Sequence, residues 1–299
     1  MKFGITPTSY FWDDLQKFSD WCVKVEETGF DAILVPDHYQ FPVPPFYSNS
    51  LIEAWTTLSY VSAKTSKIRL GSIVSPIPRY IPSQLAKVIA SVDLLSNGRV
   101  IAGFGIGYCP DEFVNYSPVF RFEESNVLFE KFKEGLEIII ELWENDKVTF
   151  KGKYYTLTEA VLLPKPLQKP RPPLLIGGVG RRTLKIAAKF FDYWVPPVIP
   201  QRISTLNVIR STKEYEDCKK IIQGHLKHFK RETSGFTFGV LLRFSAENNE
   251  LVREATSIIE RYRSVGCQYV VIEFSPTRLK NYIELTKMFA KEVMPSFIR

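Results

Sequence analysis

The sequence predicts an α/β protein in which eight parallel strands alternate with helices and close into a (β/α)8 barrel, the TIM-barrel architecture. Short apolar runs rich in β-branched residues recur along the chain. Most of these runs lack polar alternation, which indicates strands covered on both faces, as in a parallel sheet. Segments with helical spacing separate the runs, and 299 residues are enough for eight such units.

The predicted strands share short length and high apolar content. In chain order they are "FGIT" from residue 3, "AILV" from 32, "IRLGSIV" from 68, "VIAGFGIG" from 100, "PLLIGG" from 173, "DYWVPPV" from 192, "FTFGVLLRF" from 236 and "YVVIEF" from 269.

The predicted helices each present one apolar stripe. The first contains Phe11, Leu15, Phe18, Cys22 and Val25, at steps of four, three, four and three. Another begins near Pro82 and stops at Asn97-Gly98, because proline is favoured at a helix start and glycine just past its end. A third covers residues 129–143, where Phe, Leu, Ile and Trp again fall on one face.

The widest gap between strands, about residues 108–172, predicts an insertion after the fourth strand. It contains the helix at 129–143, then "DKVTFKGKYYTL", whose alternation predicts a hairpin. The proline-rich "LLPKPLQKPRPPLL" that follows predicts an extended loop. The competing architecture is an open doubly wound sheet split into two domains. No linker or shift in composition supports that split, so we predict one domain over residues 1–299.

Composition limits the classes of function. Apolar residues make up 45%, and the formal charge of +7 is spread along the chain, which argues against a nucleic-acid-binding arm. The four cysteines show no metal-ligand or disulfide-scaffold spacing, so no metal is expected and the thiols are predicted to be reduced. No apolar stretch approaches the ~20 residues needed to span a bilayer. We therefore expect a cytoplasmic protein that does not bind membranes.

Asp37 and His38 directly follow the second predicted strand. In such barrels the reacting groups lie on loops after the carboxyl ends of strands. Histidine titrates near neutrality and could exchange a proton with a substrate or cofactor, and the neighbouring carboxylate could orient it. The alternative is a loop histidine that only hydrogen-bonds the backbone beside a turn shaped by Pro36 and Asp37.

Two further strand ends carry small residues. In "GSIVSPIPRYIP", the residues Gly71, Ser72 and Ser75 indicate close backbone approach to a ligand, although the prolines could simply hold a loop. "GFGIG" at 103–107 is not a dinucleotide fingerprint, because its spacing is GxGxG. Its alternating glycines clear space on one face of the strand, which suits a flat ring.

The segment "IGGVGRRTLKIAAKFFD" predicts a phosphate site. A strand ends in Gly177-Gly178, Val179 and Gly180 complete a tight loop, and a helix begins near Arg181 and Arg182. Backbone N–H groups at a helix start bind anions, and glycines allow close approach. The alternative is that the glycines only cap the strand and helix while the arginines face water.

Taken together, these residues resemble the bacterial luciferase-like superfamily, and most closely its coenzyme F420-dependent oxidoreductases. The resemblance spans "GFDAILVPDHY", "IRLGSIVSPIPRYIPSQLAKVIASVDLLSNGRVIAGFGIGYCPDEF" and "LLPKPLQKPRPPLLIGGVGRRTLKIAAKFFDYWVPP". It implies the barrel independently.

The resemblance also implies a flavin or deazaflavin ring across the carboxyl mouth of the barrel. It places a non-prolyl cis peptide in the region of Ser72 and Ile73, against the central face of the ring. From the residue pattern alone, Gly105, Gly107 and Tyr108 at the end of the fourth strand are further predicted cofactor contacts. The resemblance assigns Asp37 and His38 to positions near the reacting carbon of the ring. The segment from Gly177 to Arg182 matches the phosphate-binding part of the family.

One position departs from the pattern. Some F420-dependent sugar-phosphate dehydrogenases of the family place a glutamate directly after the fourth-strand glycines, where this chain has Tyr108, with Asp111 and Glu112 a few positions later. The tyrosine could stack on the ring or donate its hydroxyl. A sugar-phosphate substrate is therefore not assumed.

The resulting hypothesis is an oxidoreductase that transfers a hydride between F420 and a small organic substrate. In this hypothesis His38 donates or accepts the proton, and Asp37 orients the His38 ring. The phosphate is held by Gly178, Gly180, Arg181 and Arg182. The alternatives are an FMN-dependent monooxygenase that uses reduced flavin, and a non-catalytic flavin-binding protein. Members of the family often pair, so a homodimer is a further expectation.

Overall fold

The structure is a computed structural model that describes residues 1–7, 15–40, 52–119, 121–199, 208–245, 250–275 and 279–298. The chain divides into two compact units, and the single domain predicted over residues 1–299 stays a prediction. The first unit comprises Met1–Leu34 and Pro173–Arg299, and the second comprises Val35–Pro172. The two units are described separately.

The strands of the first unit form parallel pairs. They are β1 (Lys2–Ile5), β2 (Ala32–Val35, whose last residue falls in the second unit), β8 (Leu174–Ile176), β9 (Tyr193–Trp194), β10 (Pro197–Val198), β11 (Thr237–Ser245) and β12 (Tyr269–Ser275). β12 lies between β11 and β1, and β1 pairs with β2 on its other side. β11 also pairs with β9 and β10, and β9 pairs with β8.

The strand predicted over 192–198 is divided into β9 and β10. Pro196 and Pro197 lie at the division, and proline has no N–H to donate to the ladder. The other predicted strands of this unit are confirmed within one or two residues at their ends.

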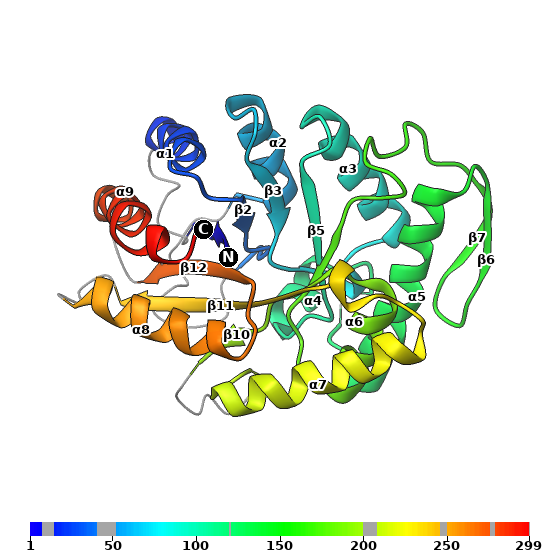
Figure 1. The fold of residues 1–299 in the computed structure, drawn as a ribbon. Helices are drawn as coiled ribbons and strands as arrows, with labels where there is room; N and C mark the ends of the chain where they lie inside the picture. The colour runs from blue at the N-terminus through cyan, green and yellow to red at the C-terminus, as the bar shows by residue number, and fades with distance from the viewer. Residues whose placement is uncertain are drawn as a thin grey trace. The chain divides into compact units, whose positions relative to one another are not determined.

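The helices of the first unit pack on these strands. They are α1 (Leu15–Glu27), α6 (Arg181–Phe190), α7 (Thr212–His228), α8 (Leu251–Ser264) and α9 (Leu279–Met288), with short turns η3 (Thr233–Gly235), η4 (Phe289–Val293) and η5 (Met294–Ser296). Figure 1 shows α1 beside α9, and Trp21 Nε1 of α1 donates to Thr286 Oγ1 of α9 at 3.1 Å. Phe18, Cys22 and Val25 of the predicted stripe are buried, whereas Leu15, the first residue of α1, is 48% exposed. Phe11 lies outside the described residues.

Among its described residues, the second unit contains three short parallel strands and the segment over which an insertion is predicted. Its elements are α2 (Ala54–Lys64), β3 (Arg69–Ser72), β4 (Ser75–Pro76), η2 (Ile77–Arg79), α3 (Pro82–Leu95), β5 (Val100–Gly105), α4 (Pro110–Tyr116), α5 (Ser125–Glu144), β6 (Val148–Lys151) and β7 (Thr156–Ala160). β5 pairs first with β3 and then with β4. β6 and β7 form the expected antiparallel hairpin beside α5, and residues 161–172 form an extended connection without helix or strand (Figure 1).

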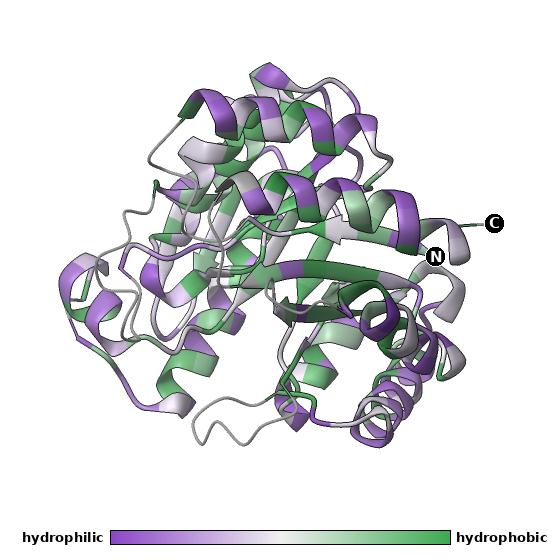
Figure 2. Cartoon of the chain, turned by 90° about the vertical axis from the view of Figure 1, so that its left-hand side faces the viewer, coloured by the Kyte–Doolittle hydropathy of each residue, from purple (hydrophilic) through white to green (hydrophobic). Residues whose placement is uncertain are grey.

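Hydropathy follows this arrangement. Figure 2 shows hydrophobic and hydrophilic residues alternating along the helices, as expected where one face packs on a core and the other meets water. The residues of β2 are buried without exception, and so are those of β5 up to Phe104. Among the described residues, no helix combines the length and apolar character needed to cross a membrane.

The connection between β3 and β4 contains a non-prolyl cis peptide. It joins Ile73 and Val74, one residue later than the Ser72–Ile73 position implied by the family resemblance. The N–H of Ile73, just before this bond, donates to the carbonyl oxygen of Val35 at 2.9 Å.

The glycines of β5 and its exit leave room for other parts of the same unit. A Cβ on Gly103 would lie 1.9 Å from the carbonyl oxygen of Ser72, and one on Gly105 would lie 2.6 Å from the Val74 side chain. Gly107 has a φ of 92° and its missing Cβ would meet the ring of Phe113 at 2.6 Å. The chain itself therefore fills the space that a Cβ would need at these glycines. The cofactor contacts expected at Gly105 and Gly107 stay predictions.

This packing predicts opposite effects for two glycine substitutions. Gly103→Ala should lower the free energy of unfolding by about 3 kcal/mol or more, because the new methyl group meets a backbone oxygen that cannot move without disturbing β3. Gly224→Ala is the control, because nothing lies within 4 Å of its missing Cβ in the interior of α7. It should raise stability by about 0.5–1 kcal/mol. Urea unfolding of both variants measures the difference, and equal stability would contradict the packing described.

Candidate active site

The candidate site begins where β2 ends. Pro36 follows the last residue of β2 and has no N–H to donate to a strand ladder. Asp37 and His38 come next and belong to the second unit. The Asp37 carboxylate is fully buried, where it ion-pairs with Arg79 and accepts a hydrogen bond from the Tyr80 hydroxyl at 2.8 Å. Burial raises the pKa of Asp37 above its ordinary value and outweighs the opposing effect of the Arg79 charge.

Arg79 is the centre of this cluster. It ends the short η2 turn, and its guanidinium has no exposed surface. Besides the Asp37 carboxylate, it donates to the Asp37 carbonyl oxygen at 3.2 Å and to Glu112 Oε2 at 3.0 Å. Its Cζ also lies 4.0 Å from the centroid of the Tyr39 ring. Burial lowers the pKa of Arg79, but the carboxylates of Asp37 and Glu112 raise it further, so the guanidinium stays charged.

Glu112 connects the arginine to the histidine. It lies in the first turn of α4, with its side chain 2% exposed. Oε1 accepts the backbone N–H of Tyr39 at 2.7 Å and contacts His38 Nδ1 at 3.1 Å, while Oε2 takes the hydrogen bond from Arg79. Burial raises the pKa of Glu112, but the hydrogen bond from His38 and the positive charge of Arg79 lower it below its ordinary value. Glu112 is therefore an anion at neutral pH.

Both ring nitrogens of His38 have partners. Because an ionised carboxylate only accepts hydrogen bonds, Nδ1 carries the proton that is donated to Glu112. Nε2 is then the acceptor nitrogen of the neutral ring, and it lies 3.3 Å from the Tyr108 hydroxyl. The two rings meet edge to face, with centroids 5.7 Å apart. This arrangement fixes the tautomer of His38 and leaves Nε2 able to accept a proton.

Three potential metal ligands meet in this cluster, namely His38, Cys109 and Glu112. The oxygens of Glu112 already accept hydrogen bonds from Arg79 and from the backbone of Tyr39. Burial, together with the charge of Glu112, raises the pKa of Cys109 to about 12, so its thiol is protonated at neutral pH. A thiolate is the form that binds metals, so the cluster fits a hydrogen-bond network better than a metal centre.

The structure therefore brings His38 and Tyr108 into contact and places Asp37 in the same cluster. The carboxylate that fixes the His38 ring belongs to Glu112, whereas the Asp37 carboxylate pairs with Arg79. Ser72 is fully buried, and its hydroxyl donates to the Gly103 carbonyl oxygen at 2.8 Å, which ties β3 to β5.

Sequence reasoning missed Arg79 and the contacts of Glu112. A signal for Arg79 was present, because it is the one charged residue of the apolar stretch "SPIPRYIP" at 75–82. A charge in such a stretch needs a buried partner. Glu112 stood out only as an acid a few positions after Tyr108, and nothing in the sequence paired it with His38, which is 74 residues away.

The predicted phosphate loop lies in the first unit. The indole N–H of Trp194 donates to the Gly178 carbonyl oxygen at 3.0 Å, and a Cβ on Gly178 would meet the Thr183 side chain at 2.6 Å. Gly180 is the N-cap of α6 and offers no side-chain cap, so the first N–H groups of the helix have no capping side chain. Arg181 and Arg182 are exposed on this first turn.

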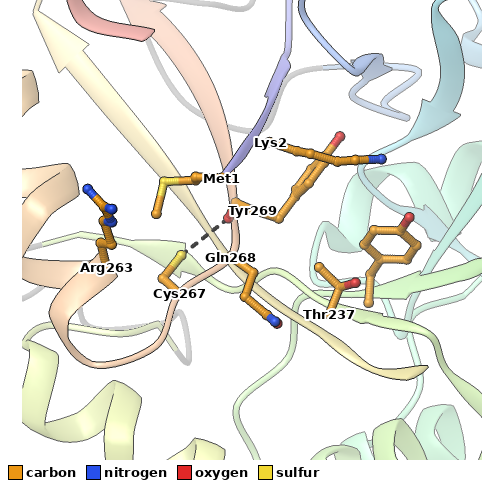
Figure 3. A pocket seen from close by; sticks show the side chains of 8 residues that line it. Met1, Lys2, Thr237, Arg263, Cys267, Gln268 and Tyr269 are labelled. Atoms are coloured by element: carbon orange, nitrogen blue, oxygen red, sulfur yellow. Dashed lines mark hydrogen bonds between the residues drawn. The ribbon is translucent and has the colours of Figure 1, made fainter. Parts of the chain in front are cut away.

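A separate cavity of about 410 Å³ also lies in the first unit (Figure 3). Its lining includes Lys2, Tyr193, Thr237 and Tyr269, which are the first residues of β1, β9, β11 and β12. The cavity therefore opens at the amino-terminal ends of these strands and contains none of the predicted site residues. In parallel barrels the reacting groups lie at the opposite, carboxyl ends.

Comparison with known proteins decides the family. The sequence profile of the family described as luciferase-like monooxygenase matches residues 2–266. The chain belongs to this family.

Its luciferase-like relatives include an F420-dependent glucose-6-phosphate dehydrogenase of Kineococcus radiotolerans, 32% identical over 183 residues, which cover 60% of this chain and 51% of the relative. An F420-dependent hydroxymycolic acid dehydrogenase of Mycobacterium tuberculosis is 28% identical over 173 residues, covering 57% and 46%. The chain thus spans about half the length of these relatives.

Solved structures share the fold of this luciferase-like chain. An F420-dependent secondary alcohol dehydrogenase in complex with an F420–acetone adduct matches with a TM-score of 0.83 at 18% identity, over 100% of this chain and 99% of the other. The oxygenating constituent of 3,6-diketocamphane monooxygenase of Pseudomonas putida, in complex with FMN, gives a TM-score of 0.75 at 13% identity, over 100% and 99%. The predicted (β/α)8 fold class is confirmed.

The cluster predicts a pH-dependent stability effect for Glu112→Gln. At pH 7 the variant should lose about 3 kcal/mol of unfolding free energy, because Arg79 stays buried with one carboxylate fewer. The folded-state pKa of Glu112 is depressed, so its stabilisation is complete above the ordinary value of 4.5 and disappears as the pH falls through the lower folded value. Unfolding measured from pH 7 down to pH 3 should show the variant and wild type converging.

The control for this measurement is Glu260→Gln, which removes an exposed carboxylate that pairs with Arg263 at 3.4 Å on α8. Exposed pairs of this kind contribute about 0–1 kcal/mol. A loss in Glu112→Gln no larger than in the control, or one that does not change with pH, would contradict the buried cluster.

Proposed function

We propose that this protein is an F420-dependent oxidoreductase that transfers a hydride between the deazaflavin and a small organic substrate. The observation that carries the proposal is the His38 ring, held by an anionic Glu112 at Nδ1 and open to proton exchange at Nε2. Its position directly after β2 is where barrel enzymes place reacting groups. The F420-dependent relatives support this choice of cofactor.

The residues of the first unit fit an anionic cofactor. The first turn of α6 offers N–H groups without a side-chain cap, and the glycines before it leave the backbone accessible. Arg181 and Arg182 add positive charge at the same turn. These residues would hold the phosphate of the cofactor. When bound, a deazaflavin supplies two-electron hydride chemistry, and the protein supplies binding, orientation and proton transfer.

In this proposal the residues of the second unit manage the proton. His38 accepts it at Nε2 during substrate oxidation and returns it during reduction. Glu112 keeps the ring in the required tautomer and stabilises the imidazolium that forms. Arg79 holds Glu112 in place and is itself balanced by Asp37. The orienting role expected for Asp37 thus becomes an indirect one, through Arg79 and Glu112.

A second candidate is an FMN-dependent monooxygenase that uses reduced flavin. The observation that favours it is the shared fold of the FMN-containing diketocamphane monooxygenase constituent. Anaerobic titration of the purified protein with F420 and with FMN separates the candidates. F420 binding followed by substrate-dependent reduction supports the first. Tight FMN binding with NAD(P)H-supported oxygen consumption would replace it with the second.

The proton role of His38 predicts a loss confined to turnover. His38→Ala should reduce turnover at saturating cofactor by about 100-fold or more, because the general acid–base group is gone. The affinity for F420 should change by less than about threefold in a fluorescence titration. His228→Ala, which removes another histidine at the end of α7, serves as the control. Unchanged turnover at saturation together with weaker binding would show that the proton role is wrong.

The phosphate role of the α6 start predicts the reverse pattern. Replacing Arg181 and Arg182 together by glutamine should weaken F420 binding by about tenfold or more, because two cations beside the phosphate are lost. Turnover at saturating cofactor should remain within about threefold. Lys185→Gln removes an exposed cation one turn further along α6 and should leave affinity nearly unchanged. Equal effects of the two replacements would contradict phosphate binding at this helix start.

A further inference from the structure

The substrate can reach His38 only through a limited part of its ring. Nδ1 is committed to Glu112, and Cys109 Sγ lies 3.8 Å from the same nitrogen. Nε2 faces the Tyr108 hydroxyl at 3.3 Å. The His38 side chain is 15% exposed, whereas Tyr108 is 49% exposed. The phenol is therefore the outer group of the pair, and the imidazole lies behind it.

We propose that Tyr108 is the catalytic residue that exchanges the proton with the substrate, that His38 acts through it, and that the substrate is an alcohol or the corresponding carbonyl compound. This inference rests on the proposed function and adds the group that touches the substrate and the class of bond that reacts. It also gives Tyr108 a role different from the cofactor contact predicted from the sequence.

In the oxidation of an alcohol, the carbon–hydrogen bond at the carbon that bears the hydroxyl breaks. The hydrogen would leave as a hydride with both electrons of that bond and would reduce the bound deazaflavin. The substrate O–H proton passes to the Tyr108 oxygen, and the phenolic proton passes to Nε2 of His38. A carbonyl group forms, the tyrosine is again neutral, and His38 becomes an imidazolium. Reduction of the carbonyl compound is the reverse, with each proton moving outward.

The histidine is needed because a phenol alone is a poor base at neutral pH. The ordinary pKa of a phenol is near 10. The phenol can therefore accept the substrate proton only if it passes its own proton to a second base in the same step, so that neither a phenolate nor a protonated phenol forms. The phenolic oxygen can donate one hydrogen bond while accepting another, which a relay requires. An alcohol oxygen has the matching property, because it loses its proton as the adjacent carbon loses its hydride.

Charged and polar groups surround His38. Glu112 contacts Nδ1 and is itself held by the guanidinium of Arg79, which also pairs with Asp37. The hydroxyl of Tyr80 faces Asp37, and the thiol of Cys109 faces the ring. The Glu112 carboxylate can therefore accept a hydrogen bond from Nδ1 both before the ring takes up the relayed proton and after it.

The first test uses the protein without cofactor. Nitrogen-15 NMR of labelled histidines, with His38 assigned from His38→Ala, reports which ring nitrogen carries the proton. We expect the Nδ1–H tautomer and an Nε2 resonance that changes in Tyr108→Phe. Tyr60→Phe removes the hydroxyl of another partly exposed tyrosine of the same unit and should change none of these. A predominant Nε2–H tautomer, or an Nε2 resonance indifferent to Tyr108→Phe, overturns the relay.

The second test measures turnover with F420 and two secondary alcohols, 2-propanol and cyclohexanol, as probes. Tyr108→Phe should lower turnover at saturation by about 100-fold, with F420 affinity within about threefold, and Tyr60→Phe should leave both unchanged. The double variant Tyr108→Phe/His38→Ala should be no more than about threefold slower than His38→Ala, because the two residues form one relay. Additive losses, or full turnover in Tyr108→Phe, overturn the proposal.

The outcomes separate the inference from the function on which it rests. Absence of F420 binding would refute the proposed function and leave the NMR result on His38 standing by itself. Binding and alcohol turnover that survive in Tyr108→Phe would refute only the relay. Binding without reduction of F420 by either alcohol would refute the alcohol substrate class.

Discussion

The candidate site depends on one buried interaction, the guanidinium of Arg79 between the carboxylates of Asp37 and Glu112. Removing three charged groups from water is costly, and their mutual attraction offsets that cost only if the hydrogen bonds are well placed. The planar guanidinium meets this requirement by donating to both carboxylates and to a backbone oxygen at once. The Tyr39 ring covers its face and excludes water.

This interaction joins three segments that are distant in sequence. The exit of β2 contributes Asp37, the η2 turn contributes Arg79, and the start of α4 contributes Glu112. Because Glu112 also accepts N–H groups after β2 and fixes the His38 ring, the orientation of His38 follows from where Arg79 holds the carboxylate. The chemistry proposed for His38 and Tyr108 therefore depends on the buried ion pairs of Arg79 with Asp37 and Glu112.

Close backbone packing supports the same region. The glycines at 103, 105 and 107 let β5 approach the β3–β4 connection and let Phe113 of α4 fill the remaining space. α4 begins immediately after this contact, so the position of Glu112 depends on how closely the backbone can pack there. The glycines that first suggested room for a ligand thus help to position Glu112 and, through it, His38.

The sequence by itself determined most of the strands and several of the helices, because buried parallel strands and amphipathic helices leave local patterns of apolar residues. It did not show that the strand over 192–198 is divided. It also singled out His38 and the glycine loop before α6 as candidate site residues. Both lie at the end of a predicted strand, where the adjacent residues in the sequence show the element boundary. Only the tertiary structure decided that Glu112, and not the adjacent Asp37, fixes His38, and that Arg79 connects the two carboxylates. Those contacts join residues that are 33 to 74 positions apart, and no local pattern records which distant partners a buried charge will find.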